Sequence, residues 1–149
     1  MMSSAEFKNV MNRATVAGPA SDEMIDDAES KLSLQFPSEY RAFLKEDGAA
    51  MGTGFEIAGI FADDDDGAPM WRHIVQATQR LRKSVNGMLP ESLIPISDDG
   101  CGVAYYIDAS KCNEDGCDVI AYGSGIDGKT VAGSLEEFVL KVARDELNV

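Results

Sequence analysis

The segment from Gly123 to Thr130, Gly-Ser-Gly-Ile-Asp-Gly-Lys-Thr, has the residue types and the spacing of a phosphate-binding loop. In such loops, glycine-rich backbone amides and the N-terminus of the next helix surround the phosphates, and the lysine and threonine serve phosphate and magnesium. Residues 131–133 look extended, however, and too few residues follow for the strand whose aspartate holds magnesium. We therefore expect a flexible turn between two strands, and nucleotide binding by this Gly-rich loop is a remote alternative.

Two acidic clusters fall in segments that we expect to be loops, Asp63 to Asp66 and Asp98-Asp99. A calcium loop of the EF-hand type needs glycine at its sixth position and glutamate at its twelfth. Setting Gly67 sixth puts Ala62 first and His73 twelfth, so neither end fits. Two interpretations of these clusters stay open: they are a solvated surface, or they bind a basic partner electrostatically. The candidate partner-binding residues are Asp63, Asp64, Asp65, Asp66, Asp98 and Asp99.

The thiols and the imidazole are too few for a metal centre or a histidine-based active site. The chain has three cysteines, Cys101, Cys112 and Cys117, and one histidine, His73. They cannot form a zinc site of two cysteines and two histidines or one of four cysteines, and a site of all three cysteines with His73 would join distant segments. His73 is expected in the middle of a helix, with no nucleophile signature beside it. We expect no metal, no cofactor, no catalytic residue and three free thiols, as in a reducing cytoplasm.

The charge balance limits the classes of partner. Thirteen Lys and Arg against 26 Asp and Glu give a net charge of −13 over 149 residues, of which 44% are hydrophobic. That hydrophobic content predicts a packed domain rather than a disordered acidic tail. The charge disfavours direct binding to nucleic acid or to an anionic membrane. Without a membrane-spanning apolar run or a secretory leader, the chain is expected to be cytoplasmic, with a basic protein as its partner.

The elements that position these residues follow from the hydrophobic pattern. Residues 1–20 predict a loose N-terminal arm or a short helix. Apolar residues at helical spacing predict four helices. The first covers 22–32 with Ser21 as cap, the second has Ser38 as cap and is stopped by Gly48, and the third runs from Pro69 to Asn86. The last follows Ser134, which forms a capping box with Glu137. Trp71 heads the inward stripe of the third helix and is expected to be buried. Alternation predicts strands over 55–61, 93–96, 103–107, 118–122 and 130–132.

The order of these elements predicts the fold class. Helices come first, then a run of strands, then a final helix, which favours an α+β fold over a doubly wound parallel sheet. We expect a single domain over residues 21–149, with an antiparallel or mixed β-sheet and N-terminal, central and C-terminal helices packed on it.

Several segments, in order, carry a family pattern. They are Ile25-Asp26-Asp27-Ala28-Glu29, the stretch from Phe36 to Leu44, Asp47-Gly48, Glu56 to Gly59, Leu89 to Gly100, Tyr105 to Asp108, and Val131 to Phe138. Together they resemble the SUKH superfamily, which includes the yeast cell-wall-synthesis regulator domain and many bacterial toxin-immunity proteins. The resemblance covers roughly residues 21 to 142. It departs from the family's usual Leu-Pro and Asn-Gly at Phe36-Pro37 and Asp47-Gly48.

The resemblance implies a non-catalytic α+β domain that binds and neutralises a cognate toxin, often a nuclease. An acidic antidote could cover the basic face of such a toxin with fast, electrostatically steered association. The competing implication is an intracellular regulator or scaffold, like the fungal relatives. Because the matching residues are mainly core and turn positions, they support the fold more strongly than any one partner.

Overall fold

The computed structural model describes residues 4–147 except 53, 62–71, 85–89 and 124. The described helices are α1 (Ala5–Arg13), α2 (Asp22–Leu32), α3 (Ser38–Glu46), α4 (Ile74–Ser84) and α5 (Leu135–Ala143). The described strands are β1 (Thr15–Val16), β2 (Ala50–Gly52), β3 (Phe55–Ile57), β4 (Leu93–Asp98), β5 (Ala104–Asn113), β6 (Gly116–Gly123) and β7 (Ile126–Ala132). None of the described helices is long and apolar enough to cross a membrane.

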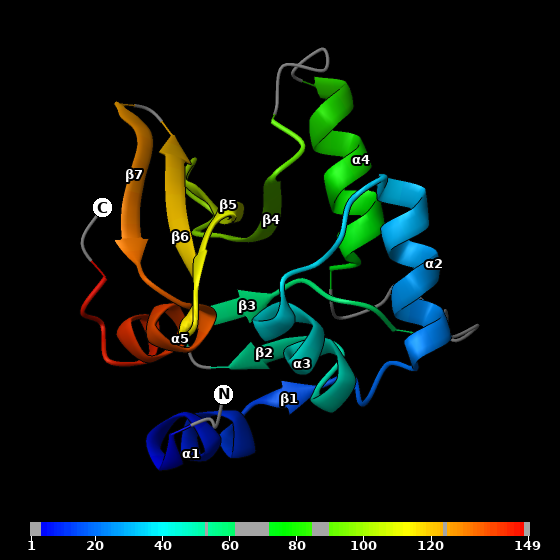
Figure 1. The fold of residues 1–149 in the computed structure, drawn as a ribbon. Helices are drawn as coiled ribbons and strands as arrows, with labels where there is room; N and C mark the ends of the chain where they lie inside the picture. The colour runs from blue at the N-terminus through cyan, green and yellow to red at the C-terminus, as the bar shows by residue number, and fades with distance from the viewer. Residues whose placement is uncertain (1–3, 53, 62–71, 85–89, 124, 148–149) are drawn as a thin grey trace.

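The strands form two antiparallel sheets (Figure 1). The first has the order β1-β2-β3, and the second is a meander in the order β4-β5-β6-β7. The backbone N–H of Ala58 donates to the carbonyl of Ile96 at 2.8 Å and joins the sheets. Helices α2 and α4 pack together on one flank, while α1 and α5 meet below the meander. The predicted α+β class is confirmed, with two antiparallel sheets in place of one.

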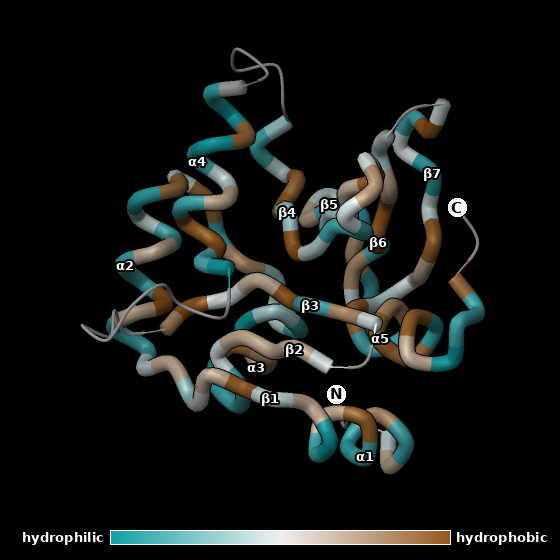
Figure 2. Tube along the Cα trace, turned by 180° about the vertical axis from the view of Figure 1, so that it is seen from behind, coloured by the Kyte–Doolittle hydropathy of each residue, from teal (hydrophilic) through white to brown (hydrophobic). Residues whose placement is uncertain are grey.

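One hydrophobic core connects both sheets with all five described helices. Each helix contributes at least one buried side chain, represented by Met11, Ile25, Tyr40, Ile74 and Phe138. The trace coloured by hydropathy shows brown and teal segments alternating along α2 and α4, as expected for helices with one face on the core (Figure 2). These shared contacts make the described chain a single packed unit.

Two of the predicted helix caps are confirmed. The Ser21 hydroxyl accepts the Met24 N–H at 3.1 Å, and the Ser134 hydroxyl accepts the Glu137 N–H at 3.0 Å. The cap predicted at Ser38 is wrong, because Ser38 is already helical and extended Pro37 holds the N-cap position. The Arg41 N–H donates to the Pro37 carbonyl at 2.9 Å, which starts α3 one residue earlier than expected.

Of the two interpretations of the first twenty residues, the structure contains a helix, α1, followed by β1. Met11 is buried in the core, and the Glu6 carboxylate pairs with Arg144 just beyond α5. The Ser4 N–H donates to Glu136 Oε1 at 2.7 Å, so α1 is tied to the start of α5 as well.

The third helix begins later than the pattern predicts. Helix α4 starts at Ile74, and His73 forms an isolated parallel bridge with Gly59 instead of lying in mid-helix. The Gly59 N–H donates to the Arg72 carbonyl at 3.0 Å, and the Ile74 N–H donates to the Gly59 carbonyl at 2.8 Å. These two hydrogen bonds keep residues 72–73 extended. The expected strand over 55–61 is correspondingly shorter, because β3 ends at Ile57.

The expectation that all three cysteines are free thiols is wrong for two of them. Cys112 and Cys117 form a disulfide, and Cys101 alone is a free, exposed cysteine. The hairpin register explains the pairing, since Cys112 lies opposite Cys117 and Asn113 lies opposite Gly116 across the β5–β6 turn. Directly opposite residues of an antiparallel pair have neighbouring Cβ atoms, which brings the two sulfurs together.

The Gly123–Thr130 segment connects two paired strands, as expected of a turn between strands. Gly123 ends β6 and Ile126 begins β7, with Lys129 opposite Ala121 and Thr130 opposite Ile120. The expected extension through Ala132 is confirmed, and β7 is longer than predicted. The backbone after Gly128 is therefore paired in a sheet, a geometry unlike that of a phosphate loop.

This pairing predicts that neither ATP nor GTP with magnesium stabilises the protein. A ligand at 100 times its dissociation constant would add about 2.7 kcal/mol to the free energy of unfolding, which a thermal melt detects readily. We expect no shift of the melting temperature. A shift that disappears in Lys129→Ala would contradict the hairpin interpretation and support nucleotide binding.

Two earlier expectations fall outside the described residues. The burial of Trp71 and the loop character of Asp63 to Asp66 both concern residues 62–71.

Candidate functional site

A groove of about 690 Å³ lies where α3, the β5–β6 hairpin and the start of α5 meet, with Phe7 of α1 at its side. We call it the α3 groove. It combines apolar side chains, among them Phe36, Phe43 and Leu135, with five carboxylates. The carboxylates are Glu39, Glu46, Asp47, Glu114 and Glu136. Among the described residues lining it, none is lysine or arginine.

Helix α3 presents three different faces, and this division positions the groove. Tyr40, Phe43 and Leu44 are buried in the core. Arg41 and Lys45, one turn apart, pair with carboxylates of α2. Of the remaining positions, Glu39, Ala42 and Glu46 follow the i, i+3, i+7 spacing of one helix face and line the groove. The three faces of α3 therefore contribute to the core, to the contact with α2 and to the groove wall.

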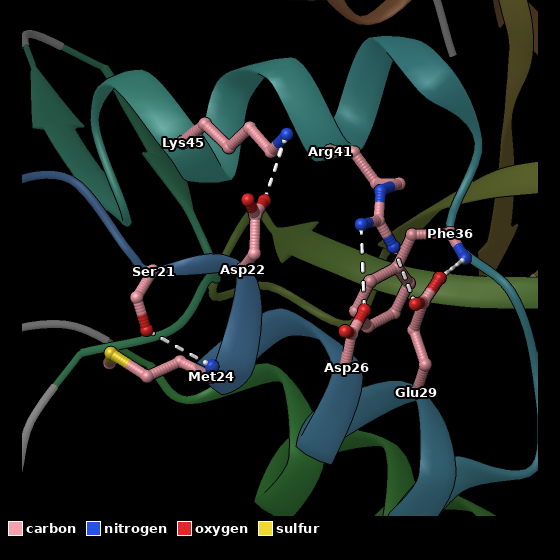
Figure 3. A network of polar contacts seen from close by, with 8 residues as sticks. All are labelled: Ser21, Asp22, Met24, Asp26, Glu29, Phe36, Arg41 and Lys45. Carbon is pink, nitrogen blue, oxygen red and sulfur yellow. Dashed lines mark hydrogen bonds and ion pairs between the residues drawn. The ribbon is translucent and has the colours of Figure 1, made fainter.

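A polar network fixes α3 against α2 (Figure 3). The two carboxylate oxygens of Glu29 accept the Phe36 N–H at 2.7 Å and the Arg41 guanidinium. Asp26 lies 3.6 Å from Arg41, and Asp22 lies 2.8 Å from the Lys45 ammonium. The hydrogen bond and charge of Lys45 lower the pKa of Asp22. Because the network holds Phe36 and α3, it also holds one wall of the groove.

Glu39 connects α3 with the N-terminus of α5. Its carboxylate accepts the Leu135 N–H at 2.8 Å and the Glu136 N–H at 3.3 Å, both otherwise unpaired amides of a first helical turn. The backbone of Cys117 donates to it as well. Burial raises the pKa of Glu39, and these amide hydrogen bonds oppose the rise. A carboxylate from a distant helix thus complements the positive end of α5.

Gly116 allows the hairpin to approach Glu39 closely. A Cβ atom at this position would lie 2.5 Å from Glu39 Oε1, far inside van der Waals contact. Its φ of 139° is also in a region that side chains of L-residues rarely adopt. The glycine therefore brings the disulfide-bonded hairpin tip against α3 and closes that end of the groove.

At the other end of the groove, Glu46 and Asp47 are neighbouring carboxylates. Burial, and secondarily the charge of Glu46, raise the pKa of Asp47 to about 6. Within the described part of the chain, neither residue has a cation at ion-pair distance, and the same holds for Glu114 at the hairpin tip. The groove therefore concentrates negative charge that the chain itself does not neutralise there.

The raised pKa of Asp47 predicts how its contribution to stability changes with pH. Its folded pKa of about 6 lies above the ordinary 3.8, so the protonated form stabilises the fold below about pH 4. That contribution is lost as pH rises through 6. Asp47→Asn should therefore be more stable than the parent at pH 8, by on the order of 1 kcal/mol after allowance for partial exposure.

Urea unfolding of the parent and Asp47→Asn at pH 4 and pH 8 checks this prediction. The advantage of the asparagine variant should shrink toward zero at pH 4, where Asp47 of the folded protein is protonated and as neutral as asparagine. An advantage of equal size at both pH values would show that charge on Asp47 is not the cause.

The predicted acidic residues Asp98 and Asp99 lie elsewhere. Both are exposed, at the β4–β5 turn, whereas the α3 groove adjoins the β5–β6 turn at the opposite end of β5. Asp98 pairs with Arg72. Asp99 accepts the backbone N–H groups of Cys101 at 2.7 Å and Val103 at 3.0 Å, and these hydrogen bonds lower its pKa. They shape the turn and leave its negative charge on the surface.

The groove residues were not predicted as site residues from the sequence. The spacing of Glu39, Ala42 and Glu46 was available as a signal, because these positions share a helix face that is neither apolar nor basic. The register of the β5–β6 hairpin, which brings Gly116 and Glu114 to that face, was not available from spacing alone. The acidic groove is formed by contacts between segments about 75 to 100 residues apart.

The fold and the groove define a small α+β domain with an acidic hollow at one end of its larger sheet. The chain belongs to the SUKH_5 family, described as SMI1-KNR4 cell-wall, whose model matches residues 5–144. This confirms the family resemblance. The wider SUKH family includes immunity proteins and consists generally of non-catalytic immunity and regulatory proteins.

Solved structures support the same fold. A crystal structure of a protein from Pseudomonas syringae pv. tomato is similar with a TM-score of 0.63 and 14% sequence identity, covering 95% of this chain and 96% of that one. At this identity the likeness concerns the fold alone. No curated protein matches the chain significantly.

Proposed function

We propose that this protein is a non-catalytic immunity protein that binds and neutralises a cognate toxin with a basic surface, of the nuclease type. The observation that carries the proposal is membership of the SUKH_5 family over residues 5–144. The net charge of −13 supports a basic protein partner over a nucleic acid or a membrane.

The two acidic clusters of the sequence are the proposed steering surface for this partner. Asp98 and Asp99 carry exposed negative charge at the β4–β5 turn, and Asp63 to Asp66 form the densest acidic run of the sequence. Charges at the rim of an interface mainly raise the association rate, and salt screens them over about 8–10 Å near physiological ionic strength. Changing Asp63 to Asp66 to asparagine should therefore slow association more than it speeds dissociation, and less so at high salt.

The second candidate is a regulator or scaffold of the cell-wall-synthesis-regulator type, which the family description, SMI1-KNR4 cell-wall, favours. For both functions we propose a cytoplasmic location.

In the cytoplasm, thiol reductants would reduce the Cys112–Cys117 disulfide. The backbone pairing of β5 with β6 would then keep the hairpin in its fold.

Co-expression with the toxin domain encoded beside this gene distinguishes the two functions. The immunity proposal expects growth to be restored and the two proteins to purify together. If both proteins are folded and neither rescue nor co-purification occurs, immunity is excluded and the regulatory candidate is favoured. Rescue that tolerates the four-asparagine variant at low and high salt would retain immunity and place the contact elsewhere, at the sheet edge, the 123–130 hairpin or another face.

A further inference from the structure

We propose that the α3 groove is the docking site for a protruding segment of the toxin that carries an arginine or a lysine. This inference rests on the proposed immunity function and names the face that carries it out. The occupant is defined by chemistry, a cationic head group on an apolar stem, presented by a folded basic protein.

The size and lining of the groove fit such a side chain. Its volume of about 690 Å³ is in the range of pockets that enclose ligand groups. Phe7 is partly exposed beside it, and the mostly buried rings of Phe36 and Phe43 form apolar parts of its wall. Arginine and lysine bury their methylene stems on such surfaces while the charged head reaches polar groups, so one side chain can use both parts of the groove.

The carboxylates of the α3 groove favour an occupant with a positive charge. Glu46 and Asp47 are adjacent, and the charge of Glu46 contributes to the raised pKa of Asp47, a sign of like-charge repulsion in the free protein. Within the described chain, no cation pairs with either of them or with Glu114. A guanidinium or ammonium group from a partner would relieve this repulsion and replace water at the partly buried Asp47, where a charge pair is less screened than at the exposed Glu46 and Glu114.

The groove is also held in place before any partner arrives. Glu39 is tied to the amides of α5 and packed against Gly116, and Glu29 holds α3 through Arg41 and the Phe36 backbone. A binding site whose walls are already fixed loses little conformational entropy on association. The anchored groove should therefore contribute to a slow dissociation rate.

The α3 groove lies apart from the acidic turn that we propose as a steering surface. The groove adjoins the β5–β6 turn, and the Asp98-Asp99 cluster lies at the other end of β5. Exposed clusters act on the association rate, whereas fully engaged charge pairs act on the dissociation rate. The two regions of the protein are thus expected to differ in kinetic effect as well as in location.

The test compares two triple variants that change the net charge equally, from −13 to −10. The groove variant is Glu46→Gln, Asp47→Asn and Glu114→Gln. The matched control is Glu23→Gln, Glu91→Gln and Asp127→Asn, three exposed carboxylates that do not line the groove. Binding to the immobilised toxin domain encoded beside the gene is measured by surface plasmon resonance. We expect the groove variant to dissociate on the order of tenfold faster or more, and the control to change within about twofold.

A second pair of variants compares an arginine placed in the groove with one placed outside it, and neither variant removes a carboxylate. Ala42→Arg places a cation on the exposed groove face of α3, and Ala143→Arg adds the same residue at the exposed end of α5. Arginine is a good helix former, so both variants should fold, as thermal melts will verify. Ala42→Arg should weaken binding strongly and Ala143→Arg should leave it nearly unchanged.

The outcomes separate this inference from the proposed function. If the parent protein binds the toxin and the groove and control variants behave alike, the groove is not the docking site, although immunity stands. If Ala42→Arg also binds as the parent does, this second result excludes the groove as the docking site independently. If the parent itself does not bind the toxin, the immunity proposal fails and the groove inference fails with it.

Discussion

Replacing Phe138 with alanine should lower the free energy of unfolding by about 3–5 kcal/mol, the typical cost of truncating a fully buried phenylalanine. Phe138 is 1% exposed, and its ring centroid lies 5.0 Å from that of Tyr105 in β5. With Leu135 and Val139 it forms the buried face through which α5 packs on the core, so alanine would leave a cavity there. Chemical denaturation followed by circular dichroism measures the loss.

Phe138→Leu is the matched control, because leucine keeps most of the apolar volume and should cost clearly less than alanine. A loss below about 1 kcal/mol for Phe138→Ala would contradict the packing of α5, since it is the size expected of a surface position.

Replacing Glu29 with alanine should cost about 2–3 kcal/mol, because it removes the acceptor of one partly buried N–H and the main partner of a cation together. The Phe36 N–H loses its 2.7 Å hydrogen bond, and Arg41 keeps only Asp26 at 3.6 Å. Since these contacts hold α3, the same change should loosen the groove wall. Urea unfolding gives the loss of stability.

Asp27→Ala is a control on the same helix. Asp27 forms an exposed ion pair with Lys31 at 2.9 Å, and such pairs contribute at most about 0.5 kcal/mol. Glu29→Gln adds a second comparison, since its amide oxygen still accepts the Phe36 N–H while the charge and the second acceptor, which Arg41 uses, are lost. Equal losses for Glu29→Ala and Asp27→Ala would show that the α2–α3 network has no special role in stability.

The fold was largely predictable because its local signals agree with its tertiary packing. Helices α2 and α5 follow from apolar spacing and from serine caps, and the meander follows from alternation and turn residues. The start of α4 was missed because backbone pairing between Gly59 and the residues around His73 overrides the helical pattern. A contact with a strand that is distant in sequence leaves no periodic signal before His73.

The disulfide and the groove were missed for a related reason. Cys112 and Cys117 become partners only in the register that places Asn113 opposite Gly116, and spacing alone did not fix that register. The groove likewise requires Glu39 to meet the amides of α5, nearly one hundred residues further along the chain. Sequence analysis found the charge of the protein, and the fold determines where a part of it is concentrated.

The most direct measurement is a titration of the toxin's own activity with this protein. The purified toxin domain encoded beside the gene is assayed on its substrate while the parent protein is added from below to above equimolar amounts. Immunity through a tight complex predicts that activity falls linearly and is abolished at one protein per toxin, with the groove variant requiring a clear excess. Full toxin activity at a large excess of the folded parent protein would contradict the proposed function.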